Sequence, residues 1–272
     1  MAGRVRLEIP AFAGMTVGAG MAVGRRDDGW GAGMTRPPTI RVRLGLWGRI
    51  LPMAKRSTVL KVTGLRKSFG PVVIVDGFDL EVREGEAIAL TGRNGAGKST
   101  ILRCLVGADT PDEGTVEVNG IRMSETNPDV RRNVATVIDD LDFFPDLSVV
   151  EHLDLLARAH GVPDPETAVD EVLHEVQLVP QSGQLPGTLS SGQRRRLALA
   201  TAFVRPRKLL VLDEPEQRLD VEGVEWLAAR LAAERSRGLA IVLASHEPRL
   251  VDVVATRVVR VGSDVVAGEV GA

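Results

Sequence analysis

Residues 92–99 are the part of this chain whose types and spacing most directly indicate chemistry. They read Gly92-Arg93-Asn94-Gly95-Ala96-Gly97-Lys98-Ser99, a complete G-x-x-x-x-G-K-[ST] motif, and Thr100 follows. An apolar run at 87–90 precedes the motif, and apolar residues at helical spacing come after it. Glycines let the backbone wrap so that successive N–H groups and the helix N-terminus face phosphate oxygens. The segment predicts a loop that binds a nucleoside triphosphate. Lys98 would reach the β and γ phosphates, and the Ser99 hydroxyl would join a magnesium shell.

A pair of acids follows a second apolar run at 209–212. Asp213 and Glu214 would stand at the tip of a central parallel strand, and ligands bind at the carboxyl ends of such strands. Asp213 is therefore predicted to hold magnesium, mainly through water, and Glu214 to polarise the attacking water. An acid pair alone could equally be a solvated loop. The phosphate-loop motif upstream favours the functional interpretation.

The segment Leu189-Ser190-Ser191-Gly192-Gln193 carries a resemblance to the nucleotide-binding subunit of ATP-binding cassette proteins. It is similar to that family's signature motif, with Ser191 in place of the usual second glycine. The resemblance implies that Ser190, Ser191, Gly192 and Gln193 contact the γ-phosphate held by an opposite subunit, in a head-to-tail pair with two ATP at the interface. A Ser-Ser-Gly turn that opens a helix offers hydroxyls and N–H groups to an anion. An ordinary helix N-cap, which needs no ligand, is the alternative.

Three further segments match the order of motifs in that family. Residues 65–70 are similar to its adenine-stacking loop, which would place Phe69 against the base, although a core phenylalanine is the alternative. Leu219-Asp220 fits the D-loop, which crosses the dimer interface and brings Asp220 to the nucleotide. His246 follows an apolar run and matches the family's switch histidine, which contacts the γ-phosphate. A lone histidine would more often be structural or lie on the surface.

The chain departs from the family pattern at two places. Asp139 stands where the family normally has a glutamine, and its carboxylate can still approach magnesium as an oxygen ligand, with Asp140 and Asp142 making the local field negative. Glu216-Gln217-Arg218 replaces the small residues that commonly precede Leu219-Asp220. We expect these changes either to slow turnover or to reflect a heterodimer in which one composite site is weak.

The resemblance implies an α/β fold for residues 57–272, a normal size for one such domain with a core of its own. The family fold is a P-loop NTPase cassette with a mainly parallel core sheet, an antiparallel β subdomain and an inserted helical subdomain, here at about 140–190. From the residues themselves we expect a first strand at 59–62. The runs at 209–212 and 240–244, with a helix between them, predict parallel strands joined by a crossover.

Helix starts within the helical region can be predicted from local chemistry. Ser148 and Glu151 form a capping box, and Asp164 followed by Pro165 predicts an N-cap with proline in the first turn. Apolar residues follow both starts at helical spacing. Most of these should pack internally, so the exposed segment 140–147 is the candidate for contact with a membrane partner.

Residues 1–56 differ in composition from the remainder. They hold ten basic residues against three acidic ones and are rich in glycine, so they cannot easily bury a core. A basic arm that touches anionic lipid or nucleic acid is one interpretation. The favoured interpretation is a disordered extension, or an over-extended gene start before Met53.

Composition indicates a globular chain without its own membrane pathway. Apolar residues make up 44% and charged residues 26%, and no run reaches the roughly 18 to 20 apolar residues that span a bilayer. The single cysteine, Cys104, has no disulfide partner and is expected in the core. A cytoplasmic subunit, peripheral on the inner face of the cell membrane, is therefore expected.

We therefore predict an ATPase that uses ATP and Mg²⁺ and powers a separate transmembrane permease, paired with a second nucleotide-binding subunit. Export is favoured, because a short carboxyl end with no added regulatory domain follows Val265. No direct nucleic-acid partner is expected. The alternatives are a soluble cassette ATPase not coupled to transport, and a catalytically weak regulatory half of a heterodimer. The transported molecule is not predicted, since in this family the membrane subunit selects it.

Overall fold

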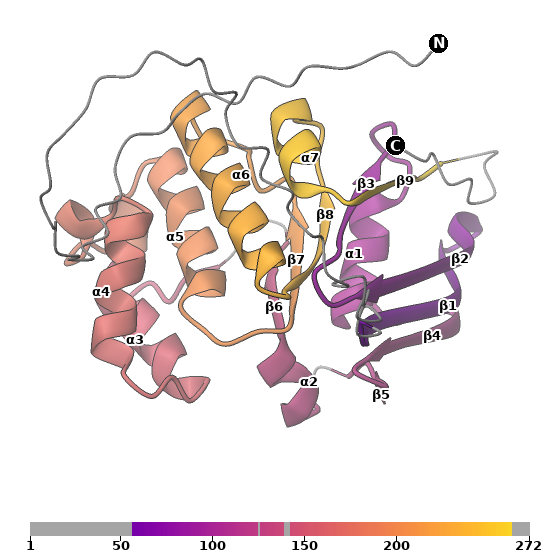
Figure 1. The fold of residues 1–272 in the computed structure, drawn as a ribbon, viewed down its shortest axis with the longest axis horizontal. Coiled ribbons are helices and arrows are strands. Elements are labelled where there is room, and N and C mark those ends of the chain that lie inside the picture. Colours follow the sequence, from indigo (N-terminus) through magenta and orange to yellow (C-terminus); the bar gives the residue numbers. More distant parts are fainter. Residues whose placement is uncertain (1–55, 125, 139–141, 263–272) are drawn as a thin grey trace, which may run out of the picture. The chain divides into compact units, whose positions relative to one another are not determined.

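The structure, a computed structural model, describes residues 56–124, 126–138 and 142–262 (Figure 1). Two expectations fall elsewhere. Asp139, the predicted magnesium ligand, and all but the last residue of the predicted extension 1–56 lie outside the described residues. The predicted domain boundaries remain predictions.

A five-stranded parallel sheet forms the centre of the fold. Its strands stand in the order β6-β7-β8-β3-β9, and every pair in it is parallel. The three central strands are almost entirely buried, as expected of strands covered on both faces. The predicted parallel pairing of 209–212 with 240–244 is confirmed. The strands are β3 (Ala87–Thr91), β6 (Val134–Val137), β7 (Leu209–Asp213), β8 (Ala240–Ala244) and β9 (Arg257–Arg260).

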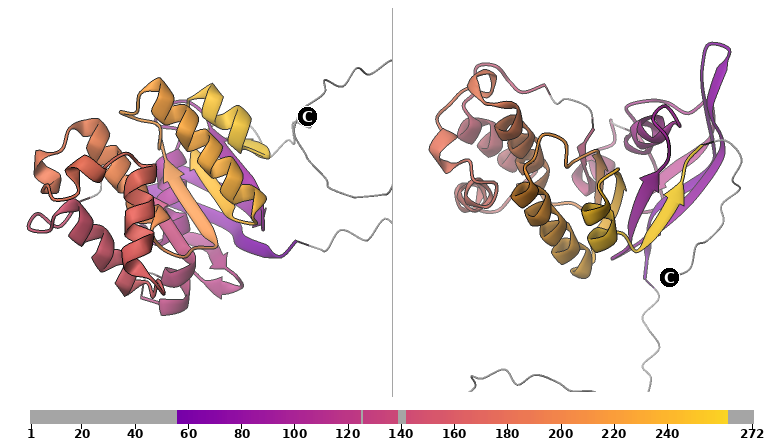
Figure 2. Two further views of the ribbon diagram at one scale, coloured as in Figure 1. Left: turned by 60° about the vertical axis from the view of Figure 1, so that its left-hand side comes forward. Right: turned by 90° about the horizontal axis from the view of Figure 1, so that it is seen from above.

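Helices cover both faces of this sheet (Figure 2). Alternate residues of β3 separate the two sides: Ile88 packs in the cluster that contains α1, whereas Ala89 packs in the cluster that contains α3 to α7. The first face carries α1 (Lys98–Val106). The opposite face carries α5 (Ser191–Phe203), α6 (Val221–Ser236) and α7 (Pro248–Val254).

A second, antiparallel sheet of order β2-β1-β4-β5 packs on the α1 side. Its strands are β1 (Thr58–Phe69), β2 (Val72–Arg83), β4 (Glu113–Val118) and β5 (Ile121–Arg122). The predicted first strand, 59–62, is thus the start of a much longer one, because pairing with β2 continues to Phe69. The segment predicted as an adenine-stacking loop is the end of this strand.

A helical region lies between β6 and β7. It contains α3 (Val149–Ala159), α4 (Pro165–Glu175) and two 3₁₀ turns, η1 (Val179–Gln181) and η2 (Pro186–Thr188), while α2 (Pro128–Asn133) precedes β6. Both predicted caps are present. Ser148 and Glu151 form the capping box of α3, and the Asp164 side chain accepts from the Thr167 N–H.

The buried faces of α3 and α4 join the cluster under α5. Together with the two sheets, these helices confirm the predicted fold class. Cys104 is buried on α1, where burial raises the pKa of its thiol to about 11. Within the described ranges, no helix has the length and apolar character needed to cross a bilayer.

Candidate functional site

The loop between β3 and α1 has a backbone that requires glycine at two positions. Gly92 has a φ of 148°, and a Cβ added there would lie 2.2 Å from the carbonyl oxygen of Val261. Gly97 has a φ of 98° and would place a Cβ 3.1 Å from a methyl carbon of Ile74. Residues that carry a Cβ rarely adopt these backbone conformations. The glycines therefore allow the loop to curl closely against its neighbours.

Lys98 is the first residue of α1, and its side chain reaches back to this loop. Its side chain is buried, and its ammonium donates to the carbonyl oxygens of Gly92 at 2.9 Å and Arg93 at 3.2 Å. Gly97 is the N-cap of α1, so the N–H groups of the first helical turn, which have no acceptor within a helix, point toward the loop. Ser99 is exposed at this turn. A cation and several N–H groups around one loop are a donor set that fits phosphate oxygens.

The acid pair lies at the end of β7. Asp213 pairs with Ala244 of β8, and the Glu214 N–H donates to the Ala244 carbonyl at 2.8 Å. Glu214 leaves the strand with a φ of 42°, and its carboxylate accepts a hydrogen bond from the Gln217 side chain. A positive φ at a non-glycine residue is uncommon and often marks a functional turn.

Three of the predicted segments leave the parallel sheet at the same edge. The loop at 92–97 follows β3, Asp213 and Glu214 end or follow β7, and His246 follows β8, which stands between the other two strands. Neighbouring strands lie about 4.8 Å apart, so all three segments fall within about two strand spacings. The structure thus brings together the residues for which the sequence predicted phosphate, metal and water chemistry.

Arg195 of α5 contacts the segment 213–216, here called the acid loop, and this contact was not predicted from the sequence. Its guanidinium is buried and donates to the carbonyl oxygens of Asp213 at 2.9 Å, of Glu214, and of Pro215 at 3.2 Å. The sequence did hold an indication that this arginine is buried. Arg195 stands three residues before Ala198, so both lie on the same, buried face of the helix.

The segment predicted as the signature begins α5. The Ser190 hydroxyl accepts from the Gln193 N–H at 3.3 Å, and the Gln193 side chain accepts from the Ser190 N–H at 2.9 Å, which makes a capping box. A Cβ at Gly192 would lie 3.0 Å from the Arg218 carbonyl oxygen. These contacts agree with the N-cap interpretation, and the contact with a nucleotide stays a prediction. In Figure 1, β7 and β8 stand between α5 and α1.

Phe69 and Asp220 differ in their side-chain contacts within the chain: Phe69 is exposed, whereas Asp220 caps a helix. Phe69 is 52% exposed, so the core alternative is wrong, and the Lys67 ammonium lies 5.3 Å from its ring centroid. Asp220 is the N-cap of α6: its carboxylate accepts from the Gly223 N–H at 2.9 Å and pairs with Arg196 at 3.2 Å. A role of Asp220 at a nucleotide would add to this cap.

Magnesium fits the part of its predicted site that the structure describes. Ser99 and Asp213 belong to segments that meet at one edge of the sheet, and magnesium is commonly held by one or two protein oxygens together with phosphates and water. No group of three or more His, Cys, Asp or Glu is arranged to hold a metal by itself in residues 56–124, 126–138 and 142–262.

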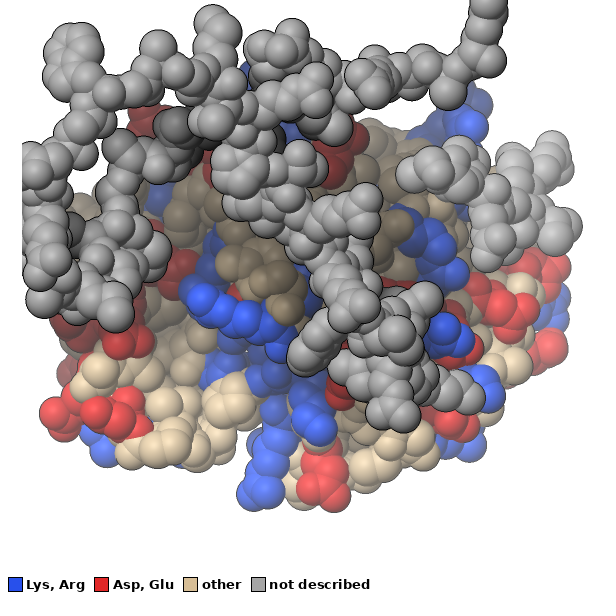
Figure 3. Space-filling view, viewed as in Figure 1, with Lys and Arg blue, Asp and Glu red and all other residues tan. Residues whose placement is uncertain are grey.

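A cavity of about 460 Å³ opens beside β6, away from the loop at 92–97. Ile138 and Thr136 of this region line it, with His160, Arg131 and Arg205 contributing polar groups. Lys and Arg side chains gather over the lower centre of the face in Figure 3, where Figure 1 places α2. Because Arg131 and Arg205 line the cavity and no acidic side chain of the described residues does, the charged part of the cavity lining is cationic.

These features define a nucleotide-binding cassette of the P-loop class. Residues 75–217 match the model of the ABC transporter family, and the chain belongs to that family. It is an ATP-binding subunit and an ATPase of this family.

Relatives in known transport systems and a solved structure support the assignment. SkfA peptide export ATP-binding protein SkfE of Bacillus subtilis is 34% identical over 74% of this chain and 84% of its own length. Spermidine/putrescine import ATP-binding protein PotA of Pseudomonas aeruginosa is 34% identical over 70% of this chain, which spans only 53% of that relative. A solved ATP binding subunit of an ABC transporter has a TM-score of 0.71 and 27% identity, over 75% of this chain and 86% of that one.

Proposed function

We propose that the protein hydrolyses ATP to energise a separate transmembrane permease, as one of two paired cassette subunits. The observation that carries this proposal is the meeting of the loop at 92–97, the acid pair 213–214 and His246 at one edge of the parallel sheet. Export is the proposed direction. The peptide-export relative is matched over 84% of its length and the import relative over 53%.

The proposed roles rest on the motifs and on the elements that carry them. ATP supplies a γ-phosphoryl group for transfer to water. Lys98 and the N–H groups of the loop would neutralise the phosphate charge. Ser99 and Asp213 would hold Mg²⁺, with Asp139 as a further ligand outside the described residues. Glu214 would take the proton of the attacking water, and His246 would contact the γ-phosphate from the end of β8.

A second cassette subunit is proposed because the two segments predicted to contact phosphate, the loop at 92–97 and the signature at 190–193, lie apart in a single chain. The exposed serines at 190 and 191 open α5, which covers the face of the sheet opposite α1. A head-to-tail pair would bring this helix N-terminus to the nucleotide of the other subunit. Phe69 would stack on the adenine of its own subunit, and its exposed ring supports this.

The permease is proposed to contact the segment 140–147, which follows β6 and of which residues 142–147 are described. Phe144 in this segment is 53% exposed. Ile138, the last described residue before 139–141, lines the cationic cavity beside β6. An exposed aromatic ring and a cavity near the same segment offer both apolar area and charge to a partner.

One observation favours the alternative of a catalytically weak subunit. The Glu214 carboxylate, proposed as the general base, accepts a hydrogen bond from Gln217, a residue larger than is common at this position of the family. If this bond persists with nucleotide bound, water would have to compete with the Gln217 amide for the carboxylate.

The test is Glu214→Gln, which removes the basic charge and almost no volume. We expect phosphate release to fall at least about 100-fold, while ATP-dependent dimerisation measured by light scattering persists. Glu222→Gln, at an exposed position of α6, makes the same change of charge and should hydrolyse ATP normally. A wild-type rate well above the uncatalysed background that is unchanged in Glu214→Gln would reject the catalytic assignment. A wild-type rate close to that background would favour the weak subunit.

A further inference from the structure

The carboxylate of Glu216 joins the acid loop to the turn that carries His246. Its Oε1 accepts from the Ser245 hydroxyl at 2.6 Å and from the His246 N–H at 3.3 Å. Glu216 belongs to the run 216–218 that departs from the family pattern, and none of the roles proposed above uses its side chain. The contact spans 29 residues of sequence.

Ser245 makes this connection well defined. The residue is buried, and its Oγ also accepts from the Glu247 N–H at 3.0 Å, so one hydroxyl organises the turn between β8 and α7. Its single proton goes to Glu216. A hydroxyl that donates to a carboxylate forms a short, charge-assisted hydrogen bond, about twice as strong as one between neutral groups.

The acid loop is also held by Arg195, which binds the carbonyl oxygens of residues 213–215. The Glu214 N–H is already bonded to the backbone of β8. Two residues after Glu214, the Glu216 side chain accepts hydrogen bonds from the turn between β8 and α7. Glu214 and His246 are therefore linked by the short backbone segment 214–216 and by the hydrogen bonds of Glu216 to the following turn.

We propose that Glu216 is a positioning residue for ATP hydrolysis, which fixes His246 relative to Glu214. The inference rests on the proposed function, in which those two residues act at the γ-phosphate and the attacking water. Misplacement of a reacting group by about 1 Å can cost on the order of 100-fold in rate. Two bonds at the base of the His246 turn are well placed to prevent such a displacement.

The first test compares three substitutions at this position. Glu216→Ala removes both bonds, and we expect kcat to fall about tenfold while KM for ATP stays within about twofold. Glu216→Gln keeps a side-chain oxygen that can accept from Ser245 and His246, so its kcat should stay within about threefold of the wild type. Glu216→Asp keeps the charge but is shorter, and should resemble the alanine variant. Glu222→Ala, at an exposed site on α6, is the control.

A double-mutant cycle with His246→Ala tests whether Glu216 acts through the histidine. The variant with both Glu216→Ala and His246→Ala should hydrolyse ATP within about twofold of His246→Ala alone. If the two effects multiply instead, the positioning role is wrong. If His246→Ala itself hydrolyses ATP at the wild-type rate, the proposed role of His246 fails, and this inference fails with it. Should Glu216→Ala not fold, Glu216→Asp takes its place in the cycle.

Discussion

Replacing either of two glycines of the phosphate loop would strain the backbone, but only one replacement would also cause a steric clash. Gly95 has a φ of 79° and no atom within 4 Å of an added Cβ. Gly92 has a φ of 148°, and its added Cβ would lie 2.2 Å from the carbonyl oxygen of Val261. Alanine at Gly95 would therefore be destabilised only by its unfavourable φ, whereas alanine at Gly92 must also displace the backbone after β9.

We expect Gly92→Ala to lower the free energy of unfolding by at least about 3 kcal/mol, because strain and overpacking add. Gly95→Ala should lower it by about 1–2 kcal/mol. Urea unfolding followed by circular dichroism measures both values. Equal losses in the two variants would show that the approach of Gly92 to Val261 does not constrain the fold.

The side chains of the site differ in how far sequence could predict them. The loop at 92–97 depends on local spacing, so its motif predicts both its place and its donors. The exposure of Phe69 depends on the pairing of β1 with β2, and spacing alone left open whether it was a core residue. The bond between Glu216 and Ser245 could not be predicted, because only the register of β7 against β8 brings these residues together.

Arg207, four residues after α5, caps the carboxyl end of that helix with its side chain. Its Nη1 donates to the carbonyl oxygens of Ala202 at 2.9 Å, Phe203 at 3.0 Å and Arg205 at 2.9 Å. The last carbonyls of a helix have no partner within it and carry partial negative charge, so a guanidinium stabilises this end. Burial lowers the pKa of Arg207.

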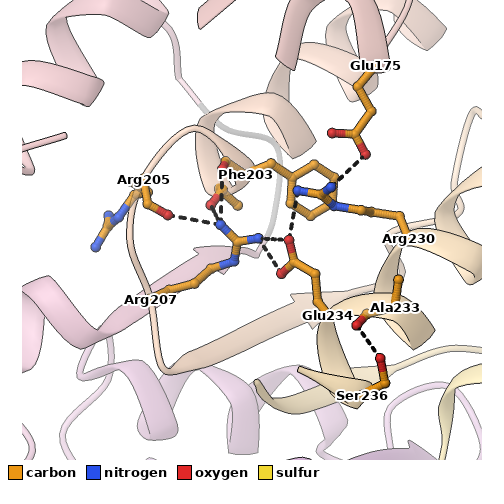
Figure 4. A network of polar contacts seen from close by, with 9 residues as sticks. Glu175, Phe203, Arg205, Arg207, Arg230, Ala233, Glu234 and Ser236 are labelled. Carbon is orange, nitrogen blue, oxygen red and sulfur yellow. Dashed lines mark hydrogen bonds and ion pairs between the residues drawn. The ribbon is translucent and has the colours of Figure 1, made fainter. Parts of the chain in front are cut away.

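Glu234 of α6 links this helix end to α4 (Figure 4). Its carboxylate pairs with Arg207 and, at 2.8 Å, with Arg230, which also contacts Glu175 of α4 at 3.2 Å. Both guanidinium groups lie near the Phe203 ring, that of Arg207 at 5.3 Å and that of Arg230 at 5.2 Å from its centroid. Three successive α-helices are thus joined around one buried carboxylate, directly or through Arg230.

Removing that carboxylate should be costly. We expect Glu234→Ala to lower the free energy of unfolding by about 3–5 kcal/mol, because the buried Arg207 and the half-buried Arg230 lose their shared partner. Glu225→Ala on the same helix is the matched control. Its pair with Arg249 is long, at 3.9 Å, and exposed, so its loss should stay within about 0.5 kcal/mol. Similar midpoints of urea unfolding for the two variants would contradict the role of Glu234.

Elements were predictable where their signals are local. The caps at Ser148 and Asp164 are set by side chains within three residues of the helix start, and both are present. The full length of β1 was not predicted, because the strand is extended by pairing with β2. The contact of Arg207 with Glu234 depends on how α6 packs beside α5, which neither helix sequence encodes alone.

For the whole molecule, the cationic cavity beside β6 affects how stability depends on pH. His160, the C-cap of α3, has its pKa lowered to about 4 by burial and by the charges of Arg205 and Arg131. The pKa of Arg205 is itself lowered to about 10, first by burial and then by Arg207 and Arg131. His160 therefore stays neutral in the folded protein across mildly acidic conditions.

We expect the free energy of unfolding to fall as the pH is lowered from about 6.5 to about 4. The unfolded chain takes up a proton at His160 near the ordinary histidine pKa of about 6.5, whereas the folded protein does so only near 4, so acid favours the unfolded state in this window. His160→Gln cannot take up that proton, and its stability should fall less steeply. Urea unfolding at pH 7, 5.5 and 4.5 measures the two slopes. Part of the slope should remain, since burial also lowers the pKa of His152. Equal slopes in the wild type and the variant would show that His160 takes up its proton equally well in the folded protein.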